Sequence, residues 1–166
     1  MKLKHISHLI TGSVMELFGV MADGKVVNSY ELTNKRGAKL KVINYGATVT
    51  SLKIPLKSGE MVDVVLGFDT LENYINSFDL ESAPYLGATV GRYAGRINNA
   101  TFNLNGEIIH LDKNNNGHSL HGGKDNFSKK VWEVKNVNEG CSPSITFGYL
   151  SPANEGNYPG DLSVEL

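Results

Sequence analysis

Two arginines lie in the glycine-rich segment Gly87–Ile97. Arg92 and Arg96 are four positions apart, an even number, so in an extended segment their side chains project from the same face. Two planar guanidinium groups on one face can line a polar cleft and grip neighbouring hydroxyl groups, or one of them can hold other site residues in place. The alternative is a pair of surface arginines, because most arginines are exposed. The glycine spacing does not fit a nucleotide-binding loop.

A second candidate segment, Asn116–Gly123, contains two histidines. His121 is followed by two glycines, which leave a ligand unobstructed access to a ring that donates or accepts hydrogen bonds near neutral pH. The alternative for His121 is a loop histidine that caps a backbone carbonyl. His118 has no third ligand at a suitable spacing, so the sequence predicts no zinc site. His110 ends an alternating strand, and we expect its ring to pack at a sheet margin.

The third candidate segment, Ser151–Gly160, is rich in turn-forming residues and leads into the last predicted strand. Its expected role is structural, with Tyr158 as an anchor. Three carboxylates could be proposed as the acid or base of a catalytic site: Glu155 in this segment, and Asp79 and Glu81 elsewhere. Because isolated carboxylates in loops are nearly always solvated, we assign none of them a catalytic role.

The elements that must position these residues are short strands. Apolar residues recur with period two, and Gly, Asn and Asp interrupt the runs every eight to fifteen residues, which predicts an all-β protein. We draw no internal domain boundary. The predicted strands are Glu16–Met21, Val27–Thr33, Ala38–Ile43, Thr48–Ile54, Val62–Leu66, Thr101–Leu104, Glu107–His110, Val131–Val137, Ser144–Leu150 and Leu162–Leu166.

One helix and two tight turns complete the predicted elements. The helix is Thr70–Asn76, with Thr70 as its N-cap and Leu71 on its apolar side. Asp23-Gly24 and Asn105-Gly106 have the composition of type I′ hairpin turns, which require positive φ at both central residues.

Charge and cysteine content exclude several classes of protein. Sixteen Lys and Arg stand against 17 Asp and Glu, with no long basic block, so we predict no nucleic-acid partner and expect Lys129-Lys130 to be a solvated surface pair. Cys141 is the only cysteine, which precludes an intramolecular disulfide, fits a reducing compartment and is interpreted as an ordinary loop thiol. The first 21 residues, which include His5 and His8, lack a continuous apolar core, so we predict neither a secretory signal nor a membrane span.

The last five residues, Leu162–Leu166, alternate apolar and polar side chains and stop on a core-type residue. Natural termini more often end in polar residues. We therefore expect a fragment, or a chain whose partner strands come from elsewhere. Either case leaves an open sheet edge that invites pairing with another chain or self-association.

Several separated motifs occur along the chain, in the order Asn44–Ala47, Val65–Phe68, Gly87–Arg92, Ala94–Ile97, Ser119–Gly123, Trp132 and Gly156–Gly160. In this order they resemble the motifs of the aldose 1-epimerase (galactose mutarotase) family. The resemblance implies a large antiparallel β-sandwich, here its incomplete N-terminal portion over residues 1–166, in a cytoplasmic enzyme without metal or organic cofactor that acts on free hexoses such as galactose and glucose.

The resemblance also assigns site residues. The family's sugar-contacting arginine and histidine correspond to Arg96 and His121, which we expect to face one cleft. The family often has a sugar-contacting asparagine where this chain has Gly95, so that contact must be absent or made by the backbone. Three further site residues of the family have no counterpart in this chain. They are a second histidine, which is the proton donor, a glutamate near the C-terminal end, which is the base, and a sugar-binding aspartate.

The resulting hypothesis is an aldose 1-epimerase that interconverts α and β anomers by acid–base ring opening, represented by a fragment without the catalytic acid and base; His121 is a candidate auxiliary acid. The alternative is a non-catalytic carbohydrate-binding or structural β-sandwich. Downstream coding sequence with a second histidine motif and a late glutamate would favour the enzyme.

Overall fold

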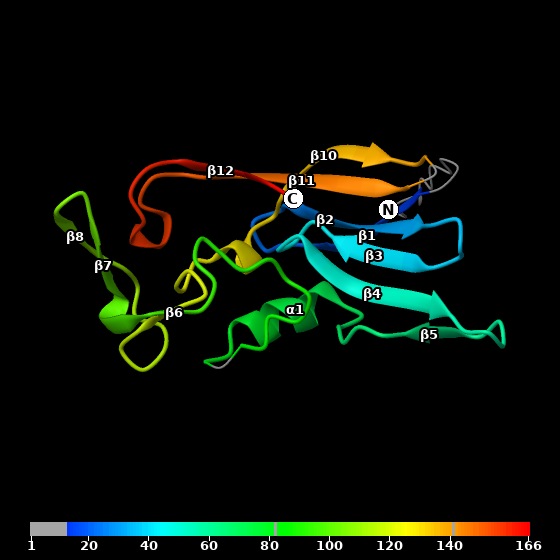
Figure 1. Ribbon diagram of the computed structural model, residues 1–166, viewed down its shortest axis with the longest axis horizontal. Helices are drawn as coiled ribbons and strands as arrows, with labels where there is room; N and C mark the ends of the chain where they lie inside the picture. Colours follow the sequence, from blue (N-terminus) through cyan, green and yellow to red (C-terminus); the bar gives the residue numbers. More distant parts are fainter. Residues whose placement is uncertain (1–12, 82, 141) are drawn as a thin grey trace.

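The computed structural model describes residues 13–81, 83–140 and 142–166, so His5, His8 and Cys141 lie outside the described residues. Two antiparallel sheets dominate the structure (Figure 1). The larger sheet has the order β1-β2-β3-β4-β5, with strands β1 Ser13–Val20, β2 Val26–Thr33, β3 Lys39–Ile43, β4 Thr48–Pro55 and β5 Met61–Asp63. The smaller sheet has the order β10-β11-β12, with strands β10 Glu133–Asn138, β11 Ser144–Ser151 and β12 Leu162–Glu165.

Two short ladders and several helical segments connect these sheets. One ladder pairs β6 Arg96–Ile97 with β9 Ser119–Leu120, and the other pairs β7 Thr101–Leu104 with β8 Glu107–His110. The α-helix is α1, Leu71–Phe78. Single 3₁₀ turns occupy Asn98–Ala100, Phe127–Lys129 and Glu155–Asn157.

The all-β prediction is confirmed, and each of the ten predicted strands overlaps an observed one. The largest errors are at Glu16–Met21, since β1 begins three residues earlier at Ser13, and at Val62–Leu66, since β5 ends three residues earlier at Asp63. At the end of β5, the Asp63 carboxylate accepts hydrogen bonds from the backbone amides of Leu52 and Val65 at 3.0 and 3.1 Å. These side-chain bonds take the place of ladder bonds, and the strand ends there.

The helix prediction is confirmed in type and start. The Thr70 hydroxyl accepts from the Asn73 amide at 3.3 Å, and the helix runs two residues beyond the predicted end because Phe78 continues the buried face. Asn105 and Gly106 have φ of 53° and 91°, as a type I′ turn requires. The type I′ prediction at Asp23-Gly24 is wrong: only Gly24 has positive φ, and the hydrogen bond from Gly24 N to Met21 O fits a three-residue loop with glycine in its left-handed position.

The two sheets face each other across one apolar cluster. Tyr30 of β2 and Val42 of β3 meet Phe147 of β11, and the Tyr30 and Phe147 rings pack edge to face at 6.3 Å. Trp132, 1% exposed, lies in the same cluster and donates its indole N–H to the Phe127 carbonyl at 3.1 Å. This face-to-face packing is that of a β-sandwich.

The opposite face of the larger sheet is covered by α1. Ile43 follows Val42 in β3, so its side chain points to the other face, where it packs with Tyr74 and Phe78 of the helix. The larger sheet therefore packs against other elements on both faces, with the helix covering part of one face. A third cluster, Ala100, Leu111 and Tyr158, packs beneath the β7–β8 hairpin and confirms Tyr158 as an anchor.

We expect the chain to self-associate in solution. Among the described strands, β1 forms one edge of the larger sheet, and Met15, Leu17 and Val20 on it are 49%, 63% and 55% exposed. An apolar edge strand with unpaired backbone groups favours pairing with another chain. Size-exclusion chromatography with light scattering should show dimers or larger species, and a compact stable monomer would contradict this expectation.

Candidate functional site

The β6–β9 ladder places Arg96 and His121 beside each other. Arg96 pairs with Leu120 and Ile97 with Ser119. Just beyond the ladder, the His121 amide donates to the Gly95 carbonyl at 2.9 Å, and the Gly95 amide donates to His121 Nδ1 at 3.2 Å. Both backbone groups of Gly95 are thus bonded to His121, and a backbone contact from Gly95 to a sugar stays a prediction.

The surroundings of His121 favour its neutral form. Burial lowers the pKa of His121 below its ordinary 6.5, and the positive charge of Arg96 lowers that pKa further. Since Nδ1 accepts the Gly95 amide, the proton of the neutral ring is assigned to Nε2. The Tyr85 ring packs edge-on to the imidazole at 5.7 Å. The site therefore presents an uncharged imidazole that donates through Nε2.

Arg96 is oriented by the loop that precedes β9. Its Nε donates to the Asn115 side-chain oxygen at 3.0 Å. Asn114 holds this loop in shape, because its amide group both donates to the Leu120 carbonyl and accepts from the Leu120 amide. Within the described residues, the two terminal nitrogens of Arg96 make no hydrogen bond and are available to a ligand.

Two pockets flank this pair. One, of about 490 Å³, is lined by both predicted arginines and by aromatic and aliphatic side chains: Arg92, Tyr93, Arg96, Ile97, Phe102 and Tyr158. The other, of about 480 Å³, includes Tyr85, Asn115 and Leu120 in its lining. The single cleft shared by the Arg96 and His121 side chains stays a prediction, since His121 is not in the lining of the pocket beside Arg96.

Arg92 has a different role from Arg96. The expectation of an extended segment is wrong here, since residues 92–95 form bends and only Arg96–Ile97 is strand. The Arg92 guanidinium donates to the Ser151 hydroxyl at 2.8 Å and to the backbone carbonyls of Ser151, Pro152, Pro159 and Gly160. Arg92 is thus the arginine that holds other residues in place.

Two other histidines lie in the described part of the chain, His110 and His118, and neither is in the lining of the two pockets beside Arg96. His118 Nδ1 accepts from the Asn99 amide at 3.0 Å, which is a capping contact. His110 is exposed, so the expected packing of its ring at a sheet margin is wrong: its strand belongs to a hairpin that projects from the molecule (Figure 1). Within the described ranges, no three His, Cys, Asp or Glu side chains are grouped so as to hold a metal.

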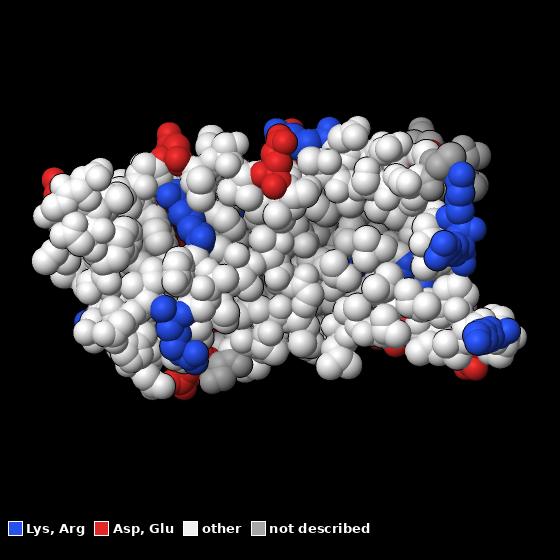
Figure 2. Space-filling view, in the orientation of Figure 1, with Lys and Arg blue, Asp and Glu red and all other residues white. Residues whose placement is uncertain are grey.

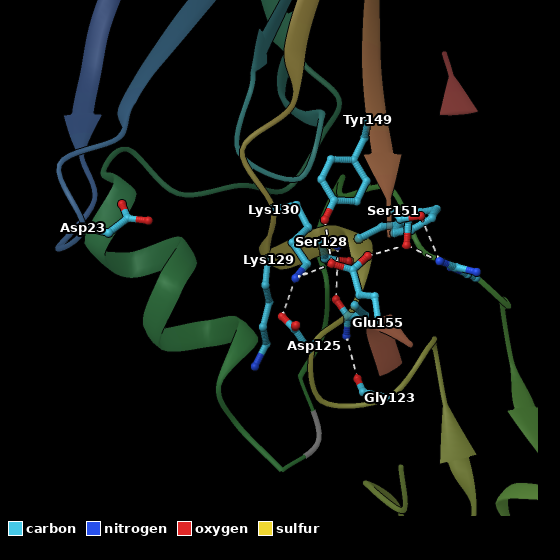
Figure 3. Close-up of polar contacts among 12 residues, drawn as sticks. Asp23, Gly123, Asp125, Ser128, Lys129, Lys130, Tyr149, Ser151 and Glu155 are labelled. Carbon is cyan, nitrogen blue, oxygen red and sulfur yellow. Dashed lines mark hydrogen bonds and ion pairs between the residues drawn. The ribbon is translucent and has the colours of Figure 1, made fainter. Parts of the chain in front are cut away.

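The expectation that Glu155 is solvated is wrong. Its side chain is 8% exposed and forms an ion pair with Lys130 at 2.7 Å. Its carboxylate also accepts from the Tyr149 hydroxyl at 2.6 Å and from the Ser151 hydroxyl (Figure 3). Burial by itself raises the pKa of Glu155, but hydrogen bonds from Lys130, Ser151 and Tyr149 outweigh burial and leave the pKa below its ordinary value.

The lysine pair is likewise more buried than predicted. Lys130 is 17% exposed and pairs with Asp125 as well as with Glu155. Lys129 is 23% exposed and pairs with Asp79, whose own side chain is 62% exposed as expected. On the face shown in Figure 2, basic and acidic side chains form small separate groups among uncharged areas.

Sequence reasoning missed three residues around the site. Asn114 and Asn115 lie just before the candidate segment Asn116–Gly123, and Tyr85 carried no signal. Tyr85 lies in a loop segment, and its hydroxyl accepts from the Asn126 side chain at 2.9 Å. Its contact with His121 joins residues 36 positions apart, which no local pattern reveals.

Residues 28–166 match the family model described as aldose 1-epimerase. The chain belongs to the aldose 1-epimerase family. It is 41% identical over 126 residues to galactose mutarotase from Bos taurus, covering 76% of this chain and 34% of that protein. It is 36% identical to galactose mutarotase from Homo sapiens, covering 89% and 41%, and 32% identical to aldose 1-epimerase from Escherichia coli, covering 87% and 39%.

Solved structures show the same fold. A galactose 1-epimerase from Lactobacillus acidophilus superimposes with a TM-score of 0.75 at 27% identity, covering 92% of this chain and 42% of that one. An aldose epimerase homologue from C. elegans superimposes with a TM-score of 0.71 at 34% identity, covering 81% and 39%. The chain spans about two-fifths of the length of the relatives that it matches. Its fold is thus that of the aldose epimerases. In the described part of the chain, no helix is long and apolar enough to cross a membrane.

Proposed function

We propose that the chain is the N-terminal, sugar-binding part of an aldose 1-epimerase acting on free hexoses such as galactose and glucose in the cytoplasm. The observation that carries the proposal is the meeting of two segments in a chain of this family: Arg96 pairs with Leu120 in the β6–β9 ladder, and His121, the next residue, is bonded to the backbone of Gly95. The guanidinium of Arg96 has free hydrogen-bond donors, and the imidazole of His121 is neutral. Both groups suit the hydroxyl and ring oxygens of a sugar.

Anomer interconversion needs two proton transfers. One group donates a proton to the ring oxygen while another removes the proton of the anomeric hydroxyl, so the bond between the anomeric carbon and the ring oxygen breaks and the anomeric carbon becomes a carbonyl. After rotation about the first carbon–carbon bond, the ring hydroxyl adds to the other face of the carbonyl, both protons return, and the other anomer forms. The net reaction transfers no electrons and no chemical group to or from the sugar, so we propose neither a metal nor an organic cofactor. With its proton on Nε2, His121 is able to donate to a sugar oxygen, while Arg96 grips neighbouring hydroxyls.

The principal acid and the base are proposed to lie on a segment outside these 166 residues. Glu155, the most buried carboxylate among those considered, is bonded to Lys130, Tyr149 and Ser151 and held in its charged form, which makes it a poor acceptor of a substrate proton. Asp79 is exposed and paired with Lys129. The proposed partners of this chain are therefore a free hexose and the C-terminal half of the same fold.

Sugar binding by the chain itself tests the assigned residues. D-Galactose should shift the NMR signals of the Arg96 side chain and the His121 ring in a saturable titration. Arg96→Ala should weaken binding by about tenfold or more, because a hydrogen bond from a charged donor contributes about 1.5–3 kcal/mol. Arg36→Ala, at an exposed turn residue, is the matched control and should leave binding unchanged. If both variants bind galactose like the unmodified chain, Arg96 is not a sugar-binding residue.

A further inference from the structure

We infer that Arg92 and Glu155 are positioning residues for His121. They act through the loop Ser151–Gly160, which joins the antiparallel strands β11 and β12 and is called the crossover below, and through the backbone of Gly122. The inference rests on the proposed function in one respect, since it takes His121 as a sugar-binding residue. Neither Arg92 nor Glu155 is needed to touch the sugar.

Arg92 closes the crossover into a loop. At the start of the crossover its guanidinium donates to the carbonyls of Ser151 and Pro152 at 2.9 and 2.8 Å. At the far end it donates to the Gly160 carbonyl at 2.9 Å. Ser151 also pairs with Leu162 where β11 meets β12, so one planar group with donors in a fixed fork reinforces the separation that the strand pairing gives to the two ends of the segment.

Glu155 fastens the middle of the same loop to the β-sheet. Its carboxylate takes hydrogen bonds from Lys130 and from Tyr149 of β11, and the Ser151 hydroxyl connects it to Arg92. Figure 3 shows this chain of contacts running from Ser151 through Glu155 to Lys130 and on to Asp125. The crossover is thus fixed at both ends and at its centre.

The fixed crossover contacts the backbone of the segment His121–Gly123, called the histidine segment below. A β-carbon at Gly156 would lie 2.8 Å from the Gly122 carbonyl oxygen, and one at Gly122 would lie 1.9 Å from the Gly91 carbonyl oxygen. Three backbones therefore touch without intervening side chains. Gly91 precedes Arg92 in the chain, Gly156 follows Glu155, and Gly122 follows His121. Each end of the polar network is one residue from a backbone contact that supports the histidine segment.

His121 needs such support because of its backbone conformation. His121 has φ of 54°, and Gly122 and Gly123 have φ of 88° and 92°. A residue with a β-carbon adopts this region at an energetic cost and stays there when surrounding contacts hold it. If the Gly122 contact loosens, the hydrogen bond from the Gly95 amide to His121 Nδ1 should weaken first, because it depends on the direction of the ring.

The test follows the geometry of His121 by NMR in the isotope-labelled 166-residue chain. Glu155→Gln removes the charge at the centre of the crossover, Arg92→Lys removes the fork at its ends, and Gly156→Ala presses directly on Gly122. We expect all three to shift the Gly95 amide signal and the His121 ring nitrogens, and to move the His121 titration midpoint upward as the ring leaves its partly buried place beside Arg96 and Tyr85.

Matched controls separate positioning from general loss of stability. Glu133→Gln alters an exposed carboxylate paired with Lys135, and Gly59→Ala introduces a β-carbon at a left-handed glycine with no atom within 4 Å. Both should leave the Gly95 and His121 signals in place. The His118 ring, whose Nδ1 also accepts a backbone amide, serves as an internal reference that should not move.

The outcomes are distinct. If Glu155→Gln fails to fold by circular dichroism, Arg92→Lys and Gly156→Ala still decide the question. Folded variants with unchanged Gly95 and His121 signals overturn the inference, whether or not galactose binds. A lack of galactose binding in the unmodified chain, with shifted signals in the variants, counts against the proposed function alone.

Discussion

The 166-residue chain by itself is expected to leave the mutarotation of α-D-galactose at its spontaneous rate. The reaction needs a positioned acid and a positioned base, and the described carboxylates that could serve as base are exposed or already bonded to neighbouring groups. Loss of one positioned acid or base costs about 10²–10⁴-fold in rate, so loss of both should remove nearly all acceleration. A longer product that supplies the second histidine and the glutamate should accelerate the reaction strongly.

Polarimetry on freshly dissolved α-D-galactose measures this directly. The chain alone should follow the curve of buffer, and the longer product or a complex with the C-terminal half should reach equilibrium far sooner. Within the active species, His121→Ala and Arg96→Ala should slow the reaction, and Arg36→Ala should not. Rapid equilibration by the 166-residue chain, abolished by His121→Ala, would show that these residues already hold a sufficient acid–base pair.

Much of the fold could be predicted from the sequence because its signals are local. Period-two alternation located the strands, and Thr70 marked the start of α1 because its hydroxyl caps the first turn. The Asn105-Gly106 turn followed from its dihedral requirements. Two-residue strands such as β6 and β9 are too short to show a period, and they were missed for that reason.

The sequence predicted the site residues only at positions that match motifs of the family. Arg96 and His121 came from the resemblance, and the structure brings their backbone segments together, since Arg96 pairs with Leu120 and His121 bonds to Gly95. The role of Arg92 and the burial of Glu155 could not be predicted, because both depend on contacts between segments distant in sequence; Arg92 and Ser151 are 59 positions apart. Residue type gave the wrong expectation for Glu155, since most loop carboxylates are exposed and this one meets Lys130 at a packed junction.

Replacement of Glu155 by alanine is expected to destabilise the chain by about 3–5 kcal/mol, which is the usual cost of removing one partner of a buried ion pair. The change leaves Lys130, 17% exposed, with Asp125 as its acidic partner, and takes the acceptor from the Tyr149 and Ser151 hydroxyls. Urea unfolding at pH 7, followed by tryptophan fluorescence, should give this difference. Glu133→Ala, which removes a carboxylate that is 69% exposed, is the control and should cost about 0–1 kcal/mol.

From the ion pair between Glu155 and Lys130 we also predict how the free energy of unfolding changes in acid. The folded state holds the pKa of Glu155 below its ordinary value of 4.5, so the unfolded chain binds a proton more readily than the folded chain. The stabilisation from this group is therefore fully present above pH 4.5 and is lost as the pH falls through the folded pKa. Glu155→Gln lacks this titration, so its deficit against the unmodified chain should be largest near neutral pH and should shrink in acid. A deficit that stays constant down to pH 3 would show that the loss comes from packing and not from the charged pair.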